Sequence, residues 1–195
     1  MESWEVICKR LLCNKAVSKW YELEINRVES KAKNTGGNKL RTYALFKQEW
    51  GYERYLDIVQ ERERRILLTK FRIGICPLRI ETGRYELVDS GYKQVRRHID
   101  AKLRFCLCCN TQCVEDEFHF LMVCPIYDEM RNILLTSVYN NILNQDLTTD
   151  VKTNIFSSLE EMFKYIMKSK GTEIILALVQ YLYGAFKCRE RILVN

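Results

Sequence analysis

Four side chains of the types that bind metals lie within 19 residues and constrain this chain more than any other feature of its sequence. The stretch from Cys106 to Cys124 has the form Cys-x2-Cys-x9-His-x4-Cys, with Cys109 and His119 as its inner members. The two-residue spacing lets Cys106 and Cys109 reach one ion from a single turn. Three thiolates and one imidazole are the ligand set of a closed, tetrahedral structural zinc site. The sequence therefore predicts that Zn²⁺ binds here and fixes the surrounding chain.

Disulfide bonds explain these cysteines less well than a metal does. The chain contains nine cysteines, an odd number that rules out complete internal pairing. Its first residues are acidic, and no apolar secretory segment follows them, so we expect an intracellular protein of the nucleus, the cytoplasm or both. Thiols stay reduced there, and clustered cysteines then indicate metal. The plainer alternative is a set of small buried apolar side chains, but one of only two histidines lies among them.

The spacing leaves open which cysteines are ligands. Cys108 adjoins Cys109, and Cys113 precedes the histidine, so both compete with the first set. The other histidine, His98, is expected to face solvent or a groove.

Local chain geometry favours His119 and Cys124 as the second pair. Asp116 suits the N-cap of a short helix that carries His119. Pro125 disfavours a helical conformation at Cys124. Along an unbroken α-helix, the five-residue step would turn Cys124 about 140° away from His119. We therefore expect the chain to leave the helix between these residues and to turn Cys124 toward the ion.

Basic side chains are concentrated in residues 60–105. This segment holds 12 Lys and Arg against 6 Asp and Glu, whereas the net charge of the whole chain is +6. The rest of the chain is therefore neutral overall. A localised basic region is the expected footprint for a phosphate backbone. The competing explanation is the solvated face of amphipathic helices.

The spacing of apolar residues predicts a mainly α fold, a helical domain with a small turn and helix that zinc staples through three cysteines and one histidine. In the segment 61–73, we expect Ile66, Leu67 and Phe71 to face the core. Polar or glycine-containing stretches at 34–38, 80–85 and 140–150 are expected to be connections. Residues 92–105 are expected to be helical at first and extended before Cys106. Helices are expected over 3–32, 40–47, 52–60, 61–73, 125–142, 156–166 and 173–191.

We divide the chain into four segments on this basis. They are an N-terminal helix with its Gly-rich joint (1–37), a basic helical segment (38–104), a zinc-binding element (105–125) and a C-terminal helical region (126–195). No transmembrane helix is expected, because the most apolar run, 174–186, is too short and contains Gln180.

Five motifs occur in an order that is shared with one known family. They are L-T-K-F-R-I at 68–73, I-E-T-G-R-Y at 80–85, F-C-L-C-C at 105–109, V-E-D-E-F-H-F-L at 114–121 and C-P-I-Y at 124–127. In this order they resemble the region downstream of the reverse transcriptase in polyproteins of animal non-LTR (LINE-type) retrotransposons. The resemblance covers about residues 38–190, and the zinc motif carries most of it.

The resemblance implies a ligand set and a role. By position, the ligands are Cys106, Cys109, His119 and Cys124, and the bystanders are Cys108 and Cys113. The polymerase signature, an aromatic residue before paired aspartates, is absent from the sequence, and no Pro-Asp plus acidic-Lys nuclease arrangement follows the zinc motif. The chain thus resembles the non-catalytic tail of such a polyprotein. The expected partners are template RNA or target DNA and the polymerase part of the same polyprotein.

Phosphate contacts are expected from the basic region, with stacking from a tyrosine beside it. Arg84 next to Tyr85 offers a charge and a stacking face, and Tyr92 is a second candidate for stacking. The predicted contact residues are Arg62, Arg64, Arg65, Lys70, Arg72, Arg84, Tyr85, Arg96, Arg97 and Arg104.

Two other functions compete with this hypothesis. In the first, zinc only staples helices, and the charge-neutral helical half docks on a protein. In the second, the chain is an enzyme, but four protein ligands leave no position for a reactive water. We expect the neighbouring Glu115, Asp116 and Glu117 to cap a helix and to complement its dipole, and we expect no catalysis.

Overall fold

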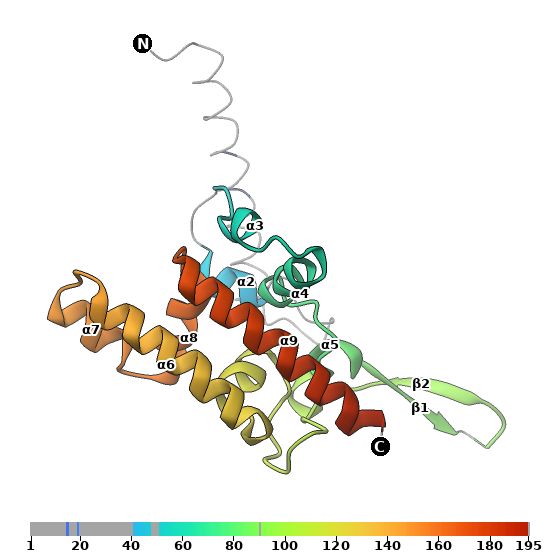
Figure 1. Ribbon diagram of the computed structural model, residues 1–195. Coiled ribbons are helices and arrows are strands. Elements are labelled where there is room, and N and C mark those ends of the chain that lie inside the picture. Colours follow the sequence, from blue (N-terminus) through green and yellow to red (C-terminus); the bar gives the residue numbers. More distant parts are fainter. Residues whose placement is uncertain (1–14, 16–18, 20–40, 48–50, 90, 195) are drawn as a thin grey trace.

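The computed structural model describes residues 15, 19, 41–47, 51–89 and 91–194. The helix expected over 3–32 and the joint at 34–38 lie outside these residues, apart from two isolated positions. The elements, shown in Figure 1, are α2 (Arg41–Phe46), α3 (Tyr55–Ile58), α4 (Arg62–Arg72), α5 (Arg79–Thr82), β1 (Tyr85–Asp89), β2 (Gln94–His98), the 3-10 turn η1 (Ala101–Leu103), the π-helix η2 (His119–Val123), the 3-10 turn η3 (Pro125–Tyr127), α6 (Asp128–Asn144), α7 (Thr149–Ile155), α8 (Leu159–Lys168) and α9 (Thr172–Val194). The prediction of a mainly α fold is confirmed.

The long C-terminal helix α9 forms the centre of the described body. It lies beside α6 along most of its length and also packs against α3, α4 and α8 (Figure 1). Leu182 and Ala185 of α9 are fully buried, as are Val138 and Ile142 of α6. Burial of one large aliphatic side chain contributes about 1.5–3 kcal/mol, so the α6–α9 contact is a major source of stability. The helix predicted over 173–191 is confirmed.

The two short helices between α6 and α9 start at side-chain caps. The Thr148 hydroxyl accepts a hydrogen bond from the Val151 amide, and the Ser158 hydroxyl accepts one from the Glu161 amide. Such caps satisfy amide groups that have no partner within the helix. They let α7 and α8 start at defined residues, and α8 then packs on α2, α9 and the π-helix η2.

Residues 80–98 differ from the prediction, because they form a short helix and a β-hairpin. The expected loop at 80–85 contains most of α5, and the expected helix after residue 92 is the strand β2, paired antiparallel with β1. Val88 lies opposite Val95 in this pairing, and β-branched residues favour strands. Gly91 has φ +84°, which suits the tight connection. The hairpin projects away from the helices (Figure 1).

Of the three core positions predicted in 61–73, one is exposed, one is partly buried (Leu67) and one is fully buried. Ile66 is 41% exposed although we expected it to face inward, whereas Phe71 is fully buried as predicted. Leu68, two positions after Ile66 and not among the predicted core residues, is buried instead. The buried residues Leu68, Phe71 and Arg72 lie about 140–240° around the helix axis from Ile66, so Ile66 is on nearly the opposite face. Among the described residues, no helix combines the length and apolar character that crossing a membrane requires.

Candidate metal centre

A short antiparallel contact places the first two candidate ligands. Phe105 and Val114 form an isolated β-bridge. The Cys106 amide donates to the Cys113 carbonyl at 2.9 Å, and the Glu115 amide donates to the Arg104 carbonyl at 3.0 Å. The chain between these pairs turns tightly, with Gln112 at φ 53°. This knuckle brings Cys109 back beside Cys106.

A π-helical turn places the second pair. The carboxylate of Asp116 accepts a hydrogen bond from the His119 amide at 2.8 Å, which confirms it as the cap of this turn. The Cys124 amide then donates to the His119 carbonyl at 2.8 Å, across five residues rather than four. Such π-turns are rare and often occur at functional sites. Cys124 itself is extended, at ψ 119°, before Pro125, as predicted.

The four ligand atoms meet at one point. The sulfurs of Cys106, Cys109 and Cys124 and a ring nitrogen of His119 all lie within 4.8 Å of one another. The Cys109 sulfur is 3.4 Å from Nε2 of His119. In a tetrahedral zinc site, bonds of about 2.0–2.3 Å place neighbouring ligand atoms about 3.6 Å apart. The donor set and the spacing therefore fit a metal ion held by four protein ligands.

Hydrogen bonds within the cluster shift the pKa values of two of its cysteines in opposite directions. The Cys124 thiol donates to the Cys106 sulfur, and this hydrogen bond, with further ones from His119 and the amides of Cys108 and Cys109, lowers the pKa of Cys106 to about 3 despite its burial. The same shared proton raises the pKa of Cys124. Nδ1 of His119 is buried and has no hydrogen-bond partner among the described residues. The ring is thus held by packing, with Nε2 toward the sulfurs.

The competing cysteines lie outside this cluster of four. Cys113 is exposed, and among the described residues its thiol donates to the Thr111 carbonyl alone, at 3.6 Å. Burial raises the pKa of Cys108 to about 11, although a hydrogen bond with Tyr127 opposes the rise. Cys108 does approach Cys106 and Glu115 closely enough to form a second ligand triad. That arrangement is disfavoured because the carboxylate of Glu115 already accepts hydrogen bonds from three donors.

Two buried carboxylates tie the knuckle to distant helices. Glu115 is fully buried, and its oxygens accept from Nε and Nη2 of Arg189 in α9, at 2.7 and 2.8 Å. It also accepts from the Arg79 amide at 2.7 Å. Glu117, 1% exposed, accepts from the Thr42 hydroxyl of α2 at 2.7 Å. Glu115 and Glu117 therefore do not cap a helix as predicted, because their buried carboxylates accept hydrogen bonds from distant segments. Of the three acidic residues, Asp116 is the helix cap.

Arg131 is a further residue of the site that the sequence did not reveal. Its guanidinium is buried against η2, where it donates to the Leu121 carbonyl at 2.9 Å and to the Cys124 carbonyl. It also pairs with Asp128. These bonds satisfy carbonyl groups at the end of the π-turn and fix the backbone of a ligand. Arg131 follows Cys124 by seven residues in the sequence. Only the tertiary structure brings its side chain back over η2.

Two of the predicted nucleic-acid contacts are buried. Arg104 is 2% exposed and donates to the carbonyls of Ile80 and Ile99. Arg72 is 6% exposed, pairs with Glu53 at 3.0 Å and donates to the Met167 carbonyl. Burial without these partners would be costly for a charged group. Both guanidinium groups are therefore held by partners within the fold and are not exposed on the outer surface.

The remaining predicted contact residues lie at or near the surface. Arg64, Arg84 and Arg97 each pair with a glutamate, the partners being Glu61, Glu81 and Glu86. Arg65 is half-buried and donates to the Leu56 carbonyl. Exposed side chains are those of Arg62, Lys70, Tyr85 and Arg96. The predicted set is therefore divided between α4 and the hairpin, and the structure does not gather it into one cluster.

His98 lies on the hairpin, outside the metal cluster. It is exposed, its ring is 5.5 Å from that of Tyr85, and its Nε2 lies 3.4 Å from a guanidinium nitrogen of Arg104. The expectation that it faces solvent is confirmed.

Comparison with known proteins adds no family to these observations. No protein-family model matches the sequence, and searches of curated proteins and of solved structures give no match either. What the molecule itself establishes is a mainly helical body with a cluster of three cysteines and one histidine that could hold a metal ion.

Proposed function

We propose that the chain is a non-catalytic, zinc-binding module that binds RNA or DNA, like the tail of the retrotransposon polyproteins that its motifs resemble. The observation that carries the zinc part is the meeting of three sulfurs and an imidazole within 4.8 Å. Soft thiolates and imidazole favour zinc over calcium or magnesium, which prefer oxygen ligands. With Cys106, Cys109, His119 and Cys124 all bound, the coordination shell is closed. The ion then supplies a structural cross-link and no reactive water.

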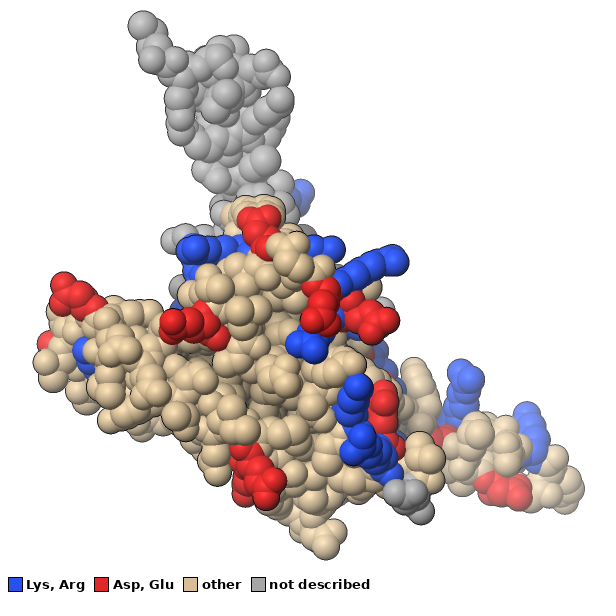
Figure 2. Space-filling view, viewed as in Figure 1, with Lys and Arg blue, Asp and Glu red and all other residues tan. Residues whose placement is uncertain are grey.

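The hairpin supports the nucleic-acid part of the proposal. Every residue of β2 is exposed, including Arg96 and Arg97. Tyr92 at the tip is fully exposed, and Tyr85 is 56% exposed. Figure 2 shows Lys and Arg side chains along this projecting element. Cationic groups for phosphates beside aromatic faces for bases are the components of a shape-led site for single-stranded or irregular nucleic acid.

A titration of a labelled RNA stem-loop and of single-stranded DNA, followed by fluorescence anisotropy at several salt concentrations, tests this part. Binding should weaken as salt rises, because cations released from the phosphates drive it. The double variant R96E/R97E should weaken binding and flatten the salt dependence by about 0.7–0.9 in slope for each phosphate that the protein no longer neutralises. The variant K152E/K164E, at the α7–α8 end, changes the charge equally and should bind as the parent does. No affinity of the parent for either nucleic acid at low salt would refute the proposal.

A protein-docking function is the second candidate, and the outer face of α6 favours it. Ile133 is 69% exposed, and Tyr139 and Leu143 are each 49% exposed. The surface over α6 is largely uncharged (Figure 2). The polymerase part of a parent polyprotein is the partner that the motif resemblance suggests. Unchanged nucleic-acid binding by R96E/R97E, together with loss of polymerase association on Ile133→Asp, would favour this function over the first.

A further inference from the structure

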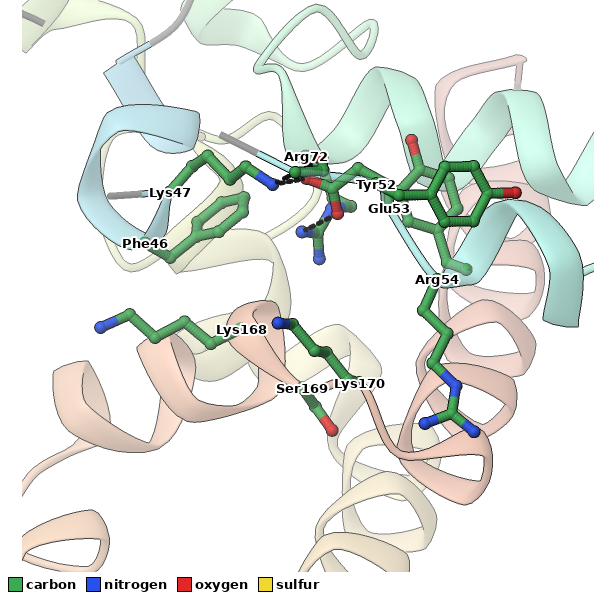
Figure 3. Close-up of a pocket in the computed structure, with 11 residues that line it drawn as sticks. Phe46, Lys47, Tyr52, Glu53, Arg54, Arg72, Lys168, Ser169 and Lys170 are labelled. Carbon is green, nitrogen blue, oxygen red and sulfur yellow. Dashed lines mark hydrogen bonds and ion pairs between the residues drawn. The ribbon is translucent and has the colours of Figure 1, made fainter. Parts of the chain in front are cut away.

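A pocket of about 260 Å³ lies between α2, the start of α3, the end of α4 and the α8–α9 connection. Figure 3 shows its two facing walls. Lys47, Glu53 and Arg72 lie on one side, and Lys168 and Lys170 on the other. This pocket contains none of the metal ligands and no residue of the hairpin. Of the site residues predicted from the sequence, Arg72 is the one that lines this pocket.

Positive charge dominates the lining of this pocket. Five of its residues are basic and one, Glu53, is acidic. The negative charge of Glu53 is balanced by two cations of the same wall, because Lys47 and Arg72 pair with it at 2.6 and 3.0 Å. Burial alone would raise the pKa of Glu53, but these two cations keep it below its ordinary value, so the carboxylate stays ionised.

The other basic residues of the pocket keep their charge available. The side chains of Arg54, Lys168 and Lys170 are exposed, and among the described residues they make no hydrogen bond or ion pair. They come from two segments far apart in the sequence. Like charges held around one hollow repel one another, and an anion inside the hollow relieves this repulsion. The unbalanced charge favours a dianion over a monoanion.

Aromatic rings complete the pocket. Phe46 and Tyr55 are buried in its wall beneath the Arg72 guanidinium, which lies 4.6 Å and 5.2 Å from their ring centroids. Tyr52 is 66% exposed at the rim, and its hydroxyl is held by Asp57 at 2.6 Å. A ring fixed in this way offers its face to an organic group. The pocket thus combines cations for an oxyanion with an apolar wall for the body that carries it.

We propose that this pocket binds the phosphate group of a phosphomonoester, with Lys168, Lys170 and Arg54 as its cationic ligands and Tyr52 against the organic part. A phosphomonoester carries a charge of about −1.5 to −2 at neutral pH, which matches the charge of the lining better than a phosphodiester does. The ligand is either a free mononucleotide or the 5′-phosphate end of a strand. The site stands apart from the hairpin and does not depend on its function.

Calorimetric titration at low salt with uridine 5′-monophosphate tests the proposal. The parent chain should bind the nucleotide and should not bind uridine, which lacks the phosphate. The double variant K168E/K170E should lose about tenfold or more in affinity, because two attractions become repulsions. Both lysines are exposed, so circular dichroism and thermal melting should show an unchanged fold. R96E/R97E carries the same change in charge and should bind the nucleotide as the parent does.

Two oligonucleotides that differ only in a 5′-phosphate distinguish the sources of the ligand. Tighter binding of the phosphorylated strand, abolished in K168E/K170E, identifies a strand end. Equal binding of both strands, with nucleotide binding retained, identifies a free nucleotide. The proposal is overturned if the parent does not bind the nucleotide, or if K168E/K170E binds it equally. Neither result concerns the hairpin, whose function is judged from R96E/R97E and the longer nucleic acids.

Discussion

At the scale of single residues, Glu115 connects the metal centre to the helical body. It follows the β-bridge that shapes the knuckle, and its carboxylate holds Arg189 from the far end of α9. Burial alone would lower the pKa of Arg189, but the hydrogen bonds and the charge of Glu115 raise it above its ordinary value. Each charge therefore depends on the other. A pair of this kind is costly to break, because the remaining charge has no partner.

Glu115→Gln should destabilise the protein by about 3–5 kcal/mol, since it leaves the buried Arg189 without its counter-charge. Chemical denaturation of the zinc-loaded protein measures the change in the free energy of unfolding. Glu61→Gln is the matched control, because it removes a solvent-exposed partner of Arg64 and should cost about 0–1 kcal/mol. A destabilisation by Glu115→Gln as small as that of the control would show that the pair contributes little.

Cys109→Ser should abolish stoichiometric zinc binding, because a serine hydroxyl is a poor substitute for a thiolate. Structural zinc contributes about 10–16 kcal/mol of apparent binding energy in small zinc fingers, so residues 104–124 should lose their structure. Elemental analysis and amide exchange measure the two effects. Cys113→Ser, which alters an exposed thiol outside the cluster, should retain the metal and the fold. Full zinc content in Cys109→Ser would disprove the ligand assignment.

At the scale of elements, the π-turn decides the geometry of the metal centre. An α-helical turn would point Cys124 away from His119. In η2 the hydrogen bond spans five residues, so each turn holds more residues and Cys124 stays on the same side as His119. The turn is short, and its carbonyl groups need partners beyond the helix. Arg131 supplies them from the first turns of α6. The element is therefore stabilised by its neighbour as well as by its own sequence.

Arg131→Met should lower zinc affinity by about 10–100-fold, the usual cost of removing a group that orients a metal ligand. The methionine keeps much of the apolar stem but frees the carbonyls of Leu121 and Cys124. Competition with a chromophoric chelator measures the affinity. Arg191→Met, at an exposed position on α9, serves as the control and should leave it unchanged. Equal affinities in the two variants would remove Arg131 from the metal centre.

At the scale of the whole molecule, the metal centre and the helices share one core. Phe120, the neighbour of His119, is fully buried, and its ring lies 4.6 Å from Phe186 of α9 and 6.0 Å from Phe71 of α4. The Tyr181 hydroxyl donates to the Phe120 carbonyl at 2.5 Å. The predicted segments 38–104, 105–125 and 126–195 thus meet at a single aromatic cluster.

A chain ended at residue 125 should therefore fail to fold cooperatively, even with zinc. It lacks α9, against which Phe120 packs, and it lacks Arg189, the partner of Glu115. Near-ultraviolet circular dichroism and a thermal melt, compared with the full chain, measure the outcome. A sharp melting transition in the shortened chain would mean that the zinc-binding element and the segments before it form an independent unit.

The local features of this protein were predictable from its sequence. The Cys106, Cys109, His119 and Cys124 set, the Asp116 cap and the exit from the helix before Pro125 depend on neighbouring residues within one short stretch. The helix α9 was predictable because the spacing of apolar residues indicates a helix over 173–191. These features follow from spacing and from the conformational preferences of single residues, which hold before any tertiary contact forms.

Only the tertiary structure decided which charged residues are buried and which are available. Arg72, Arg104 and Glu115 resemble surface residues in the sequence, yet each is buried against partners that the chain brings from elsewhere, and Arg189 lies 74 positions from Glu115. The basic pocket also depends on the tertiary structure, because residues 46–47, 51–55 and 72 line it together with the distant residues 168–170. A charge enters the interior only where a distant group compensates it. The sequence alone therefore determined the candidate ligands and most of the helices, whereas the folded chain determined which cations remain available to a partner.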